Sequence, residues 1–258
     1  MAAGACLAEV AIPSLPPAAY LLGRLDGRAE SMIEPDAPAM PTRLLEALLR
    51  DRDGGAVDIQ NLPVAFHDRL LAFVYRAELG DSVKARAACP DCGESFEFGF
   101  SLADLLATQD EAAAAVGLPD GEGRWTAPGR LRLRPPTLAD AGAGSGAALL
   151  ERLAGTPVPP ELVEDMAAFL EAASPLLSVD ISTRCPGCEA DRQVRFDLPR
   201  FLVDALAGER PFLIRETHLV AARYGWSHAE ILALSREDRR AFAALIESER
   251  SAALRRAS

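Results

Sequence analysis

The sequence predicts an α+β fold with a small β core made of two similar units, a mixed insert between them and a helical C-terminal region. Three observations favour this fold. The phrase Cys-Pro-x-Cys occurs at residues 89–92 and again 96 residues later, at 185–188, with similar flanking residues. Apolar residues alternate over residues 96–100, as in a half-buried strand. Beyond residue 198, apolar residues recur at helical spacing between capping signals.

The cysteines of the two phrases have the spacing of a metal site. A two-residue spacer lets both sulfurs of a pair reach one ion, so two pairs suit one tetrahedral zinc bound by four thiolates. Such a site has no open position, and we expect one structural zinc per chain. A redox Cys-x-x-Cys, two disulfides or a degenerate ribbon without metal are the alternatives. The prediction is a zinc-ribbon-like core with the ligands Cys89, Cys92, Cys185 and Cys188.

Three regions are expected along the chain. Residues 1–41 contain six prolines and no sustained periodicity, so a flexible, Pro-rich N-terminal arm is expected there. Residues 42–198 are expected to form the zinc-ribbon-like α+β domain, with an insert over about residues 107–178. Residues 199–258 are expected to form the helical C-terminal region.

Local signals place elements within residues 42–198. A helix is expected over residues 64–78, because Gly80 follows its apolar stripe. Ser101 can cap another helix. Residues 110–123 are rich in Ala, Gly and acidic side chains and are expected to form a loop, followed by a hairpin over residues 125–133.

Further signals divide the C-terminal region. Gly208 and Pro211 are expected to break its first helix. Ser227 and Glu230 have the spacing of a capping box, in which each side chain bonds the other residue's backbone N–H. The same signal at Ser235 predicts a last helix.

Composition narrows the function classes. The net charge is −11. This disfavours nucleic-acid binding that depends on basic side chains neutralising phosphates. No uninterrupted apolar run reaches the roughly 18 residues of a membrane span, and the N-terminus lacks the basic region of a secretory signal. A cytoplasmic protein with reduced cysteines is therefore expected.

The sequence contains few signs of catalysis. It has no phosphate-binding glycine loop, no nucleophile elbow and no His-Glu-x-x-His pattern. Glu216 and His218 are two residues apart, so on a helix they point in different directions. We expect no enzyme and no small-molecule substrate.

Residues 179–246 resemble the baseplate hub and hub-assembly proteins of contractile phage tails and related injection systems. As in that family, the similar stretches come after the second Cys-Pro-x-Cys phrase and after Phe196-Asp197-Leu198 leading to Phe201-Leu202. It is carried by three stretches, Arg215-Glu216-Thr217-His218-Leu219, Tyr224-Gly225-Trp226-Ser227 and Glu230-Ile231-Leu232-Ala233-Leu234-Ser235. Upstream, Leu131 to Thr137 with Asp140 is similar to that family's strand and R-x-P-T-x-x-D-like turn, with an extra proline.

The resemblance implies a non-enzymatic role in assembly, as a hub component or a chaperone, through contacts with baseplate, hub, spike or tail-tube proteins. Incorporation into a phage tail-like particle is one expected fate. The alternative function is a zinc-ribbon adaptor that binds nucleic acid or a transcription complex.

Residues 199–250 are the expected partner-docking part, because residues 199–258 carry +2 while residues 1–198 carry −13. Aromatic residues beside arginine are typical of interfaces. Packing of the same aromatics as ordinary core is the alternative. The partner-binding candidates are Phe212, Arg215, Glu216, His218, Tyr224 and Trp226.

Overall fold

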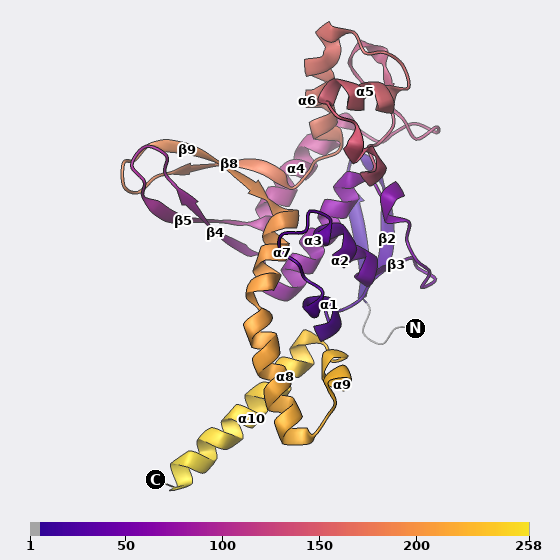
Figure 1. The fold of residues 1–258 in the computed structure, drawn as a ribbon. Coiled ribbons are helices and arrows are strands. Elements are labelled where there is room, and N and C mark those ends of the chain that lie inside the picture. Colours follow the sequence, from indigo (N-terminus) through magenta and orange to yellow (C-terminus); the bar gives the residue numbers. More distant parts are fainter. Residues whose placement is uncertain (1–5, 258) are drawn as a thin grey trace. The chain divides into compact units, whose positions relative to one another are not determined.

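The structure is a computed structural model that describes residues 6–257 and has a mixed α+β fold (Figure 1). The described residues separate into two compact units, each built from distant stretches of chain. The hairpin unit contains residues 8–20 and 57–199. The helical unit contains residues 6–7, 21–56 and 200–257.

Within the described residues, the strands form one three-stranded sheet, in the order β1-β2-β3, and three two-stranded sheets. The hairpin unit contains α3 (Val64–Leu79), β4 (Ser82–Ala88), β5 (Ser95–Ser101), α4 (Leu102–Val116), β6 (Trp125–Thr126), β7 (Arg132–Leu133), α5 (Gly146–Ala154), α6 (Val163–Ala173), β8 (Ser178–Arg184) and β9 (Asp191–Asp197). The helical unit contains α1 (Gly27–Ser31), α2 (Met40–Leu48), β3 (Leu49–Arg50), α8 (Arg210–Tyr224), α9 (His228–Leu232), α10 (Arg236–Ala257) and most of α7 (Leu198–Gly208). Strands β1 (Cys6–Ile12) and β2 (Leu15–Leu22) contribute to both units.

The two long hairpins repeat each other in register. Strand β4 pairs with β5 in an antiparallel register that begins with Ser82 opposite Ser101. Strand β8 pairs with β9 in a register that begins with Ser178 opposite Asp197. Each residue of the second hairpin lies 96 positions after its counterpart, so the predicted repeat is confirmed as a repeat of structure.

Capping signals locate several helices correctly. Helix α3 ends at Leu79, before Gly80, as predicted. The Ser101 side chain accepts a hydrogen bond from Asp104 N–H at 3.1 Å and caps α4. The predicted loop at residues 110–123 is wrong in its first half, because α4 continues to Val116. The run of alanines there has high helix propensity, which outweighs the lack of a strong apolar stripe.

The expected flexible arm also needs correction, because residues 6–41 contain β1, β2, α1 and the start of α2. The prolines of this stretch are compatible with regular structure because of where they lie. Pro13 lies in the turn between β1 and β2, and Pro16 and Pro17 lie in β2 ahead of the residues that pair with β3. Ser14 anchors this turn in the hairpin unit, where its hydroxyl donates to Ala173 C=O at 2.6 Å. Residues 1–5 of the predicted arm lie outside the described residues.

The motif similar to the R-x-P-T-x-x-D-like turn has a clear structural role. Strand β7 pairs with β6 as predicted and leads into this turn. Both terminal nitrogens of Arg134 donate to the Asp140 carboxylate, at 2.8 and 2.7 Å. The same carboxylate accepts from Thr137 N–H at 2.9 Å and completes a capping box. The motif therefore fixes the turn after β7.

The helical unit follows the predicted breaks. Helix α7 ends at Gly208, and α8 begins at Arg210 with Pro211 in its first turn, where proline is tolerated. Ser227 and Glu230 form the predicted capping box of α9. Ser235 accepts from Asp238 N–H at 3.0 Å, at the start of α10. Among residues 6–257, no helix combines the length and apolar character that a membrane crossing requires.

Candidate metal centre

Each hairpin carries a knuckle at its tip, between β4 and β5 and between β8 and β9 (Figure 1). In the first knuckle, Cys89 N–H donates to Glu94 C=O at 2.8 Å, and Cys89 C=O accepts from Gly93 N–H at 2.9 Å. Cys185 makes the same two bonds, at 3.0 and 2.9 Å, with the residues five and four positions later. These bonds turn the chain so that both sulfurs of a pair can face the same point.

The residue four positions after each first cysteine has a left-handed backbone. Gly93 has φ 73° in the first knuckle, and Glu189 has φ 59° at the equivalent place in the second. Glycine adopts this conformation readily, whereas glutamate does so at a steric cost. The shared turn is therefore kept in the second knuckle without glycine.

The knuckles bring the four predicted ligands together. The Sγ atoms of Cys89 and Cys188 are 3.6 Å apart, and those of Cys92 and Cys185 are 3.7 Å apart. All four sulfurs lie within 4.8 Å of one another. Metal–sulfur bonds of about 2.3 Å in a tetrahedron require sulfurs about 3.8 Å apart. All four cysteines are free thiols, and the cluster could hold a metal ion.

The two thiols of the first knuckle have pKa values shifted in opposite directions. Hydrogen bonds from the backbone N–H groups of Cys92 and Asp91 lower the pKa of the Cys89 thiol to about 6. Glu94 N–H has the same influence on Cys92, but burial and the neighbouring thiols raise the pKa of Cys92 to about 12. Neighbouring negative charges disfavour each other, whereas a bound cation stabilises several thiolates at once.

Arg192, on β9, is a member of the centre that sequence reasoning missed. Its guanidinium forms an ion pair with Asp91 of the first knuckle and lies beside the sulfurs of Cys89 and Cys188. Asp91, followed by Cys89, raises the pKa of Arg192 above its ordinary value. The Arg192 Nε atom is buried and has no hydrogen-bond partner. Coordinated thiolates beside it would supply acceptors, so the surroundings fit a metal–thiolate group.

Gly187 permits the close approach of the two knuckles. A Cβ atom at this position would lie 3.2 Å from the Cβ and Cγ atoms of Glu94 and 3.6 Å from the Cys92 sulfur. The first of these distances is too short for an undisturbed contact. The donor set, the sulfur spacing and this close fit together meet the requirements of a four-sulfur metal centre.

The predicted partner-binding residues lie in the helical unit, and four of them are exposed. Phe212 is 50% exposed and His218 is also exposed, both on α8. Arg215 is exposed as well, but its guanidinium forms an ion pair with Glu247 at 2.6 Å. Tyr224 is 37% exposed, so these four side chains are placed where a partner could reach them.

Glu216 and Trp226 contribute to the packing of the helical unit, and the Tyr224 ring contacts that of Trp226. Glu216 is buried and accepts from Arg239 Nε at 2.8 Å. Trp226 is half-buried, with its ring 5.2 Å from that of Phe242 and 5.3 Å from that of Tyr224. The Trp226 and Phe242 rings lie against a core cluster formed by α8, α9 and α10. Core packing therefore describes Trp226 and Glu216 better than full exposure does.

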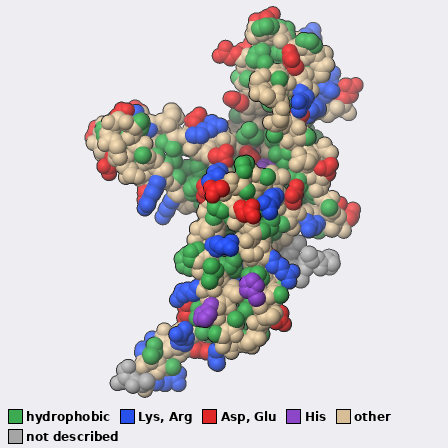
Figure 2. Space-filling view, viewed as in Figure 1, with side chains coloured by type: hydrophobic (Ala, Val, Ile, Leu, Met, Phe, Trp, Pro, Cys, Tyr) green, Lys and Arg blue, Asp and Glu red, His purple; other side chains and the backbone are tan. Residues whose placement is uncertain are grey.

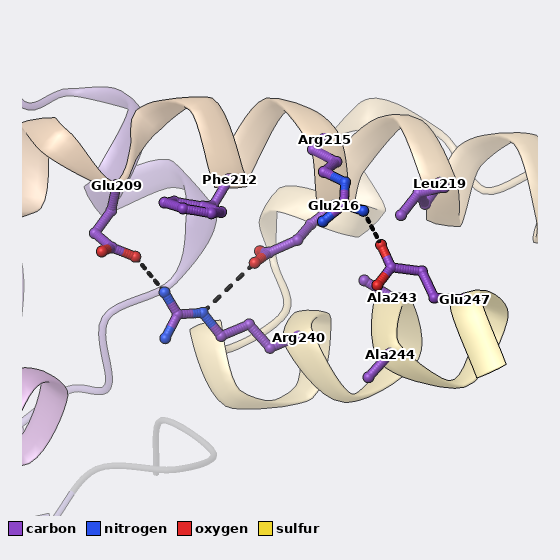
Figure 3. Close-up of a pocket in the computed structure, with 9 residues that line it drawn as sticks. All are labelled: Glu209, Phe212, Arg215, Glu216, Leu219, Arg240, Ala243, Ala244 and Glu247. Carbon is purple, nitrogen blue, oxygen red and sulfur yellow. Dashed lines mark hydrogen bonds and ion pairs between the residues drawn. The ribbon is translucent and has the colours of Figure 1, made fainter.

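A groove with a volume of about 310 Å³ lies between α8 and α10 (Figure 3). Arg240 lies beside Glu209 and Glu216, and Arg215 reaches Glu247 across the groove. Phe212 is half exposed at its edge. Because acidic and basic side chains alternate along the groove, it has no single-sign field that would select a charged ligand.

A buried charge network holds the helical unit together, and the sequence contains no evident signal for it. Arg239, 1% exposed, joins Glu30 of α1 to Glu216 of α8. Arg236 joins Glu30 to Glu209, with the second contact at 2.5 Å. Glutamate and arginine are usually exposed on helices, so composition predicts a solvated face at these positions.

Comparison with known proteins adds no relative: no family model, no curated protein and no solved structure matches this chain.

Proposed function

We propose that the four-cysteine centre holds one structural zinc ion and that the protein acts without catalysis, through protein contacts, in the assembly of a larger particle. The observation that carries the metal assignment is the meeting of four sulfurs from two knuckles, with spacing suited to a tetrahedral ion. Zinc prefers such all-thiolate tetrahedral sites. Four protein ligands leave no position for water or substrate, so the ion supplies stability.

The proposed zinc would tie the ends of a long insert. The chain leaves the first knuckle at Cys92 and returns to the second at Cys185, after α4, α5 and α6. A cross-link at these ends removes loop-closure entropy from the unfolded chain. On this basis we describe the two hairpins and their ion as a zinc-ribbon-like core, formed in the cytoplasm where thiols remain reduced.

For the larger role, we propose a baseplate hub component or hub-assembly chaperone of a contractile phage tail-like particle. The support is the resemblance over residues 179–246, which reaches from β8 into α10. The exposed candidates for contact with baseplate, hub, spike or tail-tube proteins are Phe212, Arg215, His218 and Tyr224. Glu216 and Trp226 would hold α8, which carries these four candidates, in place through their contacts with α10.

The surface is consistent with a protein partner. On the face drawn in Figure 2, acidic and basic side chains are interspersed, and hydrophobic side chains lie among them. Nucleic-acid binding relies instead on concentrated positive charge. The net charge of −11 adds to this argument.

The metal assignment is tested by elemental analysis of protein purified without chelators. We expect one zinc per chain, lost from the variant Cys185→Ser and retained in Cys6→Ser, since Cys6 lies outside the cluster. Wild-type protein that contains no zinc contradicts the assignment.

The assembly role is tested by capturing the tagged protein from cells that carry its neighbouring genes and identifying the bound proteins by mass spectrometry. Hub, spike or tail-tube proteins are expected. Salt-dependent DNA binding in a gel shift, without such partners, would favour the adaptor alternative.

A further inference from the structure

We propose that Arg192 is a positioning residue of the metal centre, which offsets the negative charge of the four thiolates and holds the two knuckles together. The inference rests on the proposed zinc site and extends it to a residue that binds no metal. It predicts that the retention of zinc depends on a cation supplied by β9.

The repeat itself singles out position 192. In the first hairpin, Phe96 pairs with Ala87, and at the equivalent place in the second, Arg192 pairs with Thr183. Phe96 is buried in an apolar cluster that also contains Cys89 and Cys185. The same register position therefore carries an apolar side chain in one hairpin and a cation in the other, so the strand itself does not require arginine there.

The contacts of Arg192 cross from one hairpin to the other. Its guanidinium leaves the second hairpin, forms an ion pair with Asp91 of the first knuckle and lies beside one sulfur from each knuckle, Cys89 and Cys188. Other arginines of these strands pair within their own hairpin, as Arg86 does with Glu97 and Arg195 with Asp180. Arg192 is also far more enclosed, with 19% of its side chain exposed against 61% for Arg195.

The position of the Arg192 guanidinium lets its positive charge offset the negative charge of the proposed zinc–thiolate group. A zinc dication with four thiolates carries a net charge of about −2, and the carboxylate of Asp91 adds to the negative field. A guanidinium is permanently charged and presents several N–H groups in a plane, so it can serve a carboxylate and a sulfur at once. The buried, unpartnered Nε of Arg192 is a donor still available for a coordinated sulfur.

The test compares zinc release from wild-type protein, Arg192→Met, Arg192→Lys and the control Arg195→Met. Each purified protein is mixed with a coloured zinc chelator, and both the total zinc and the rate of its transfer are measured. Loss of a group that supports metal ligands typically weakens metal binding about 10–100-fold. We expect Arg192→Met to release zinc roughly 10-fold faster or more, Arg192→Lys to fall between it and wild type, and Arg195→Met to match wild type.

The variants also separate charge from packing. Methionine keeps an apolar stem of similar length, and lysine keeps the charge without the planar donors. If Arg192→Met retains zinc as well as wild type does, or better than Arg192→Lys does, the inference is overturned while the zinc site stands. If wild-type protein holds no zinc, both proposals fail. If Arg192→Met does not fold, the zinc-release rate of Arg192→Lys is compared with those of wild type and Arg195→Met. A faster release from Arg192→Lys supports the inference, and an equal rate overturns it.

Discussion

The hairpin unit and the helical unit both join segments that are distant in the sequence, but they use different interactions. In the hairpin unit, four sulfurs from two tight turns meet at one point and suit a single ion. In the helical unit, Arg239 binds Glu216 and also Glu30, which lies 209 residues before it in the sequence. A metal site can be predicted from the spacing of its ligands in the sequence. A buried salt bridge between distant residues has no such sequence pattern.

A structural zinc site and a buried charge network also differ in what they contribute to the free energy of folding. Structural zinc can contribute an apparent ~10–16 kcal/mol that is linked directly to folding. A buried ion pair returns little net stability, because the desolvation of both charges offsets their attraction. Breaking it is nevertheless costly, because the remaining charge stays buried without a partner. The hairpins should therefore depend on a ligand, and the helices on each member of a charge network.

Removal of the metal should have the largest effect. We expect chelation, or Cys185→Ser, to raise hydrogen exchange strongly in β4, β5, β8 and β9, because the two knuckles lose their common ligand. Helices α8 and α10 should keep their protection, which mass spectrometry of exchanged peptides can measure. Equal loss of protection in both units would show that the comparison is wrong. Cys6→Ser serves as the control.

Arg239→Met should destabilise the helical unit by about 3–5 kcal/mol, because the buried Glu30 and Glu216 lose the cation that they share. Each keeps a longer contact of 3.5 Å, with Arg236 and Arg240 respectively. The measurement is the free energy of unfolding in denaturant, on metal-loaded protein. Arg24→Met is a matched control, because Arg24 and Glu237 form an exposed pair that should contribute less than about 1 kcal/mol. Similar costs for the two variants would contradict a special role for the buried network.

Trp226→Ala should have an intermediate effect on the stability of the helical unit, about 1–3 kcal/mol, because its ring is half-buried against Phe242 and Tyr224. Phe212→Ala should leave stability nearly unchanged, since its side chain is half exposed. The loss of captured partners from Phe212→Ala without a lower melting temperature would identify a docking surface. Unchanged capture by a folded Phe212→Ala protein would remove Phe212 from it.

The smallest expected effects are opposite pH dependences in the two units. In the hairpin unit, Arg134 lowers the pKa of Asp140 to about 2 from 3.8, so the stability this carboxylate contributes is present above pH 3.8 and is lost as pH falls towards 2. In the helical unit, burial raises the pKa of Glu30 above 4.5, although Arg239 opposes the shift. The Glu30 contribution is therefore greatest below pH 4.5 and decreases as pH rises through its folded pKa.

Carboxyl-carbon chemical shifts, followed by NMR during a pH titration, report these two groups separately from any loss of metal in acid. Arg134→Gln should return the pKa of Asp140 towards 3.8, because its bidentate partner is gone. An unchanged Asp140 titration in that variant, or a Glu30 pKa below 4.5 in the wild-type protein, would contradict the assignment of causes.

Some features of this protein are determined by local sequence. The two-residue spacer places the sulfurs of Cys89 and Cys92 in one knuckle, and those of Cys185 and Cys188 in the other. The repeat predicts that both knuckles have the same geometry. Helix caps at Ser101, Ser227 and Ser235 are equally local, because a side chain and a backbone N–H three residues away suffice to form them.

Other features were decided only by the tertiary structure, because they depend on partners far away in the chain. The prolines of residues 6–22 predict an irregular arm, whereas the turn between β1 and β2 is anchored by the bond from Ser14 to Ala173, 159 residues later. Arg192 belongs to the four-cysteine cluster because strand pairing places it beside a sulfur from each knuckle. Glu30 became a buried charge because Arg239, 209 residues later, meets it. Local propensity contains no information on such pairings.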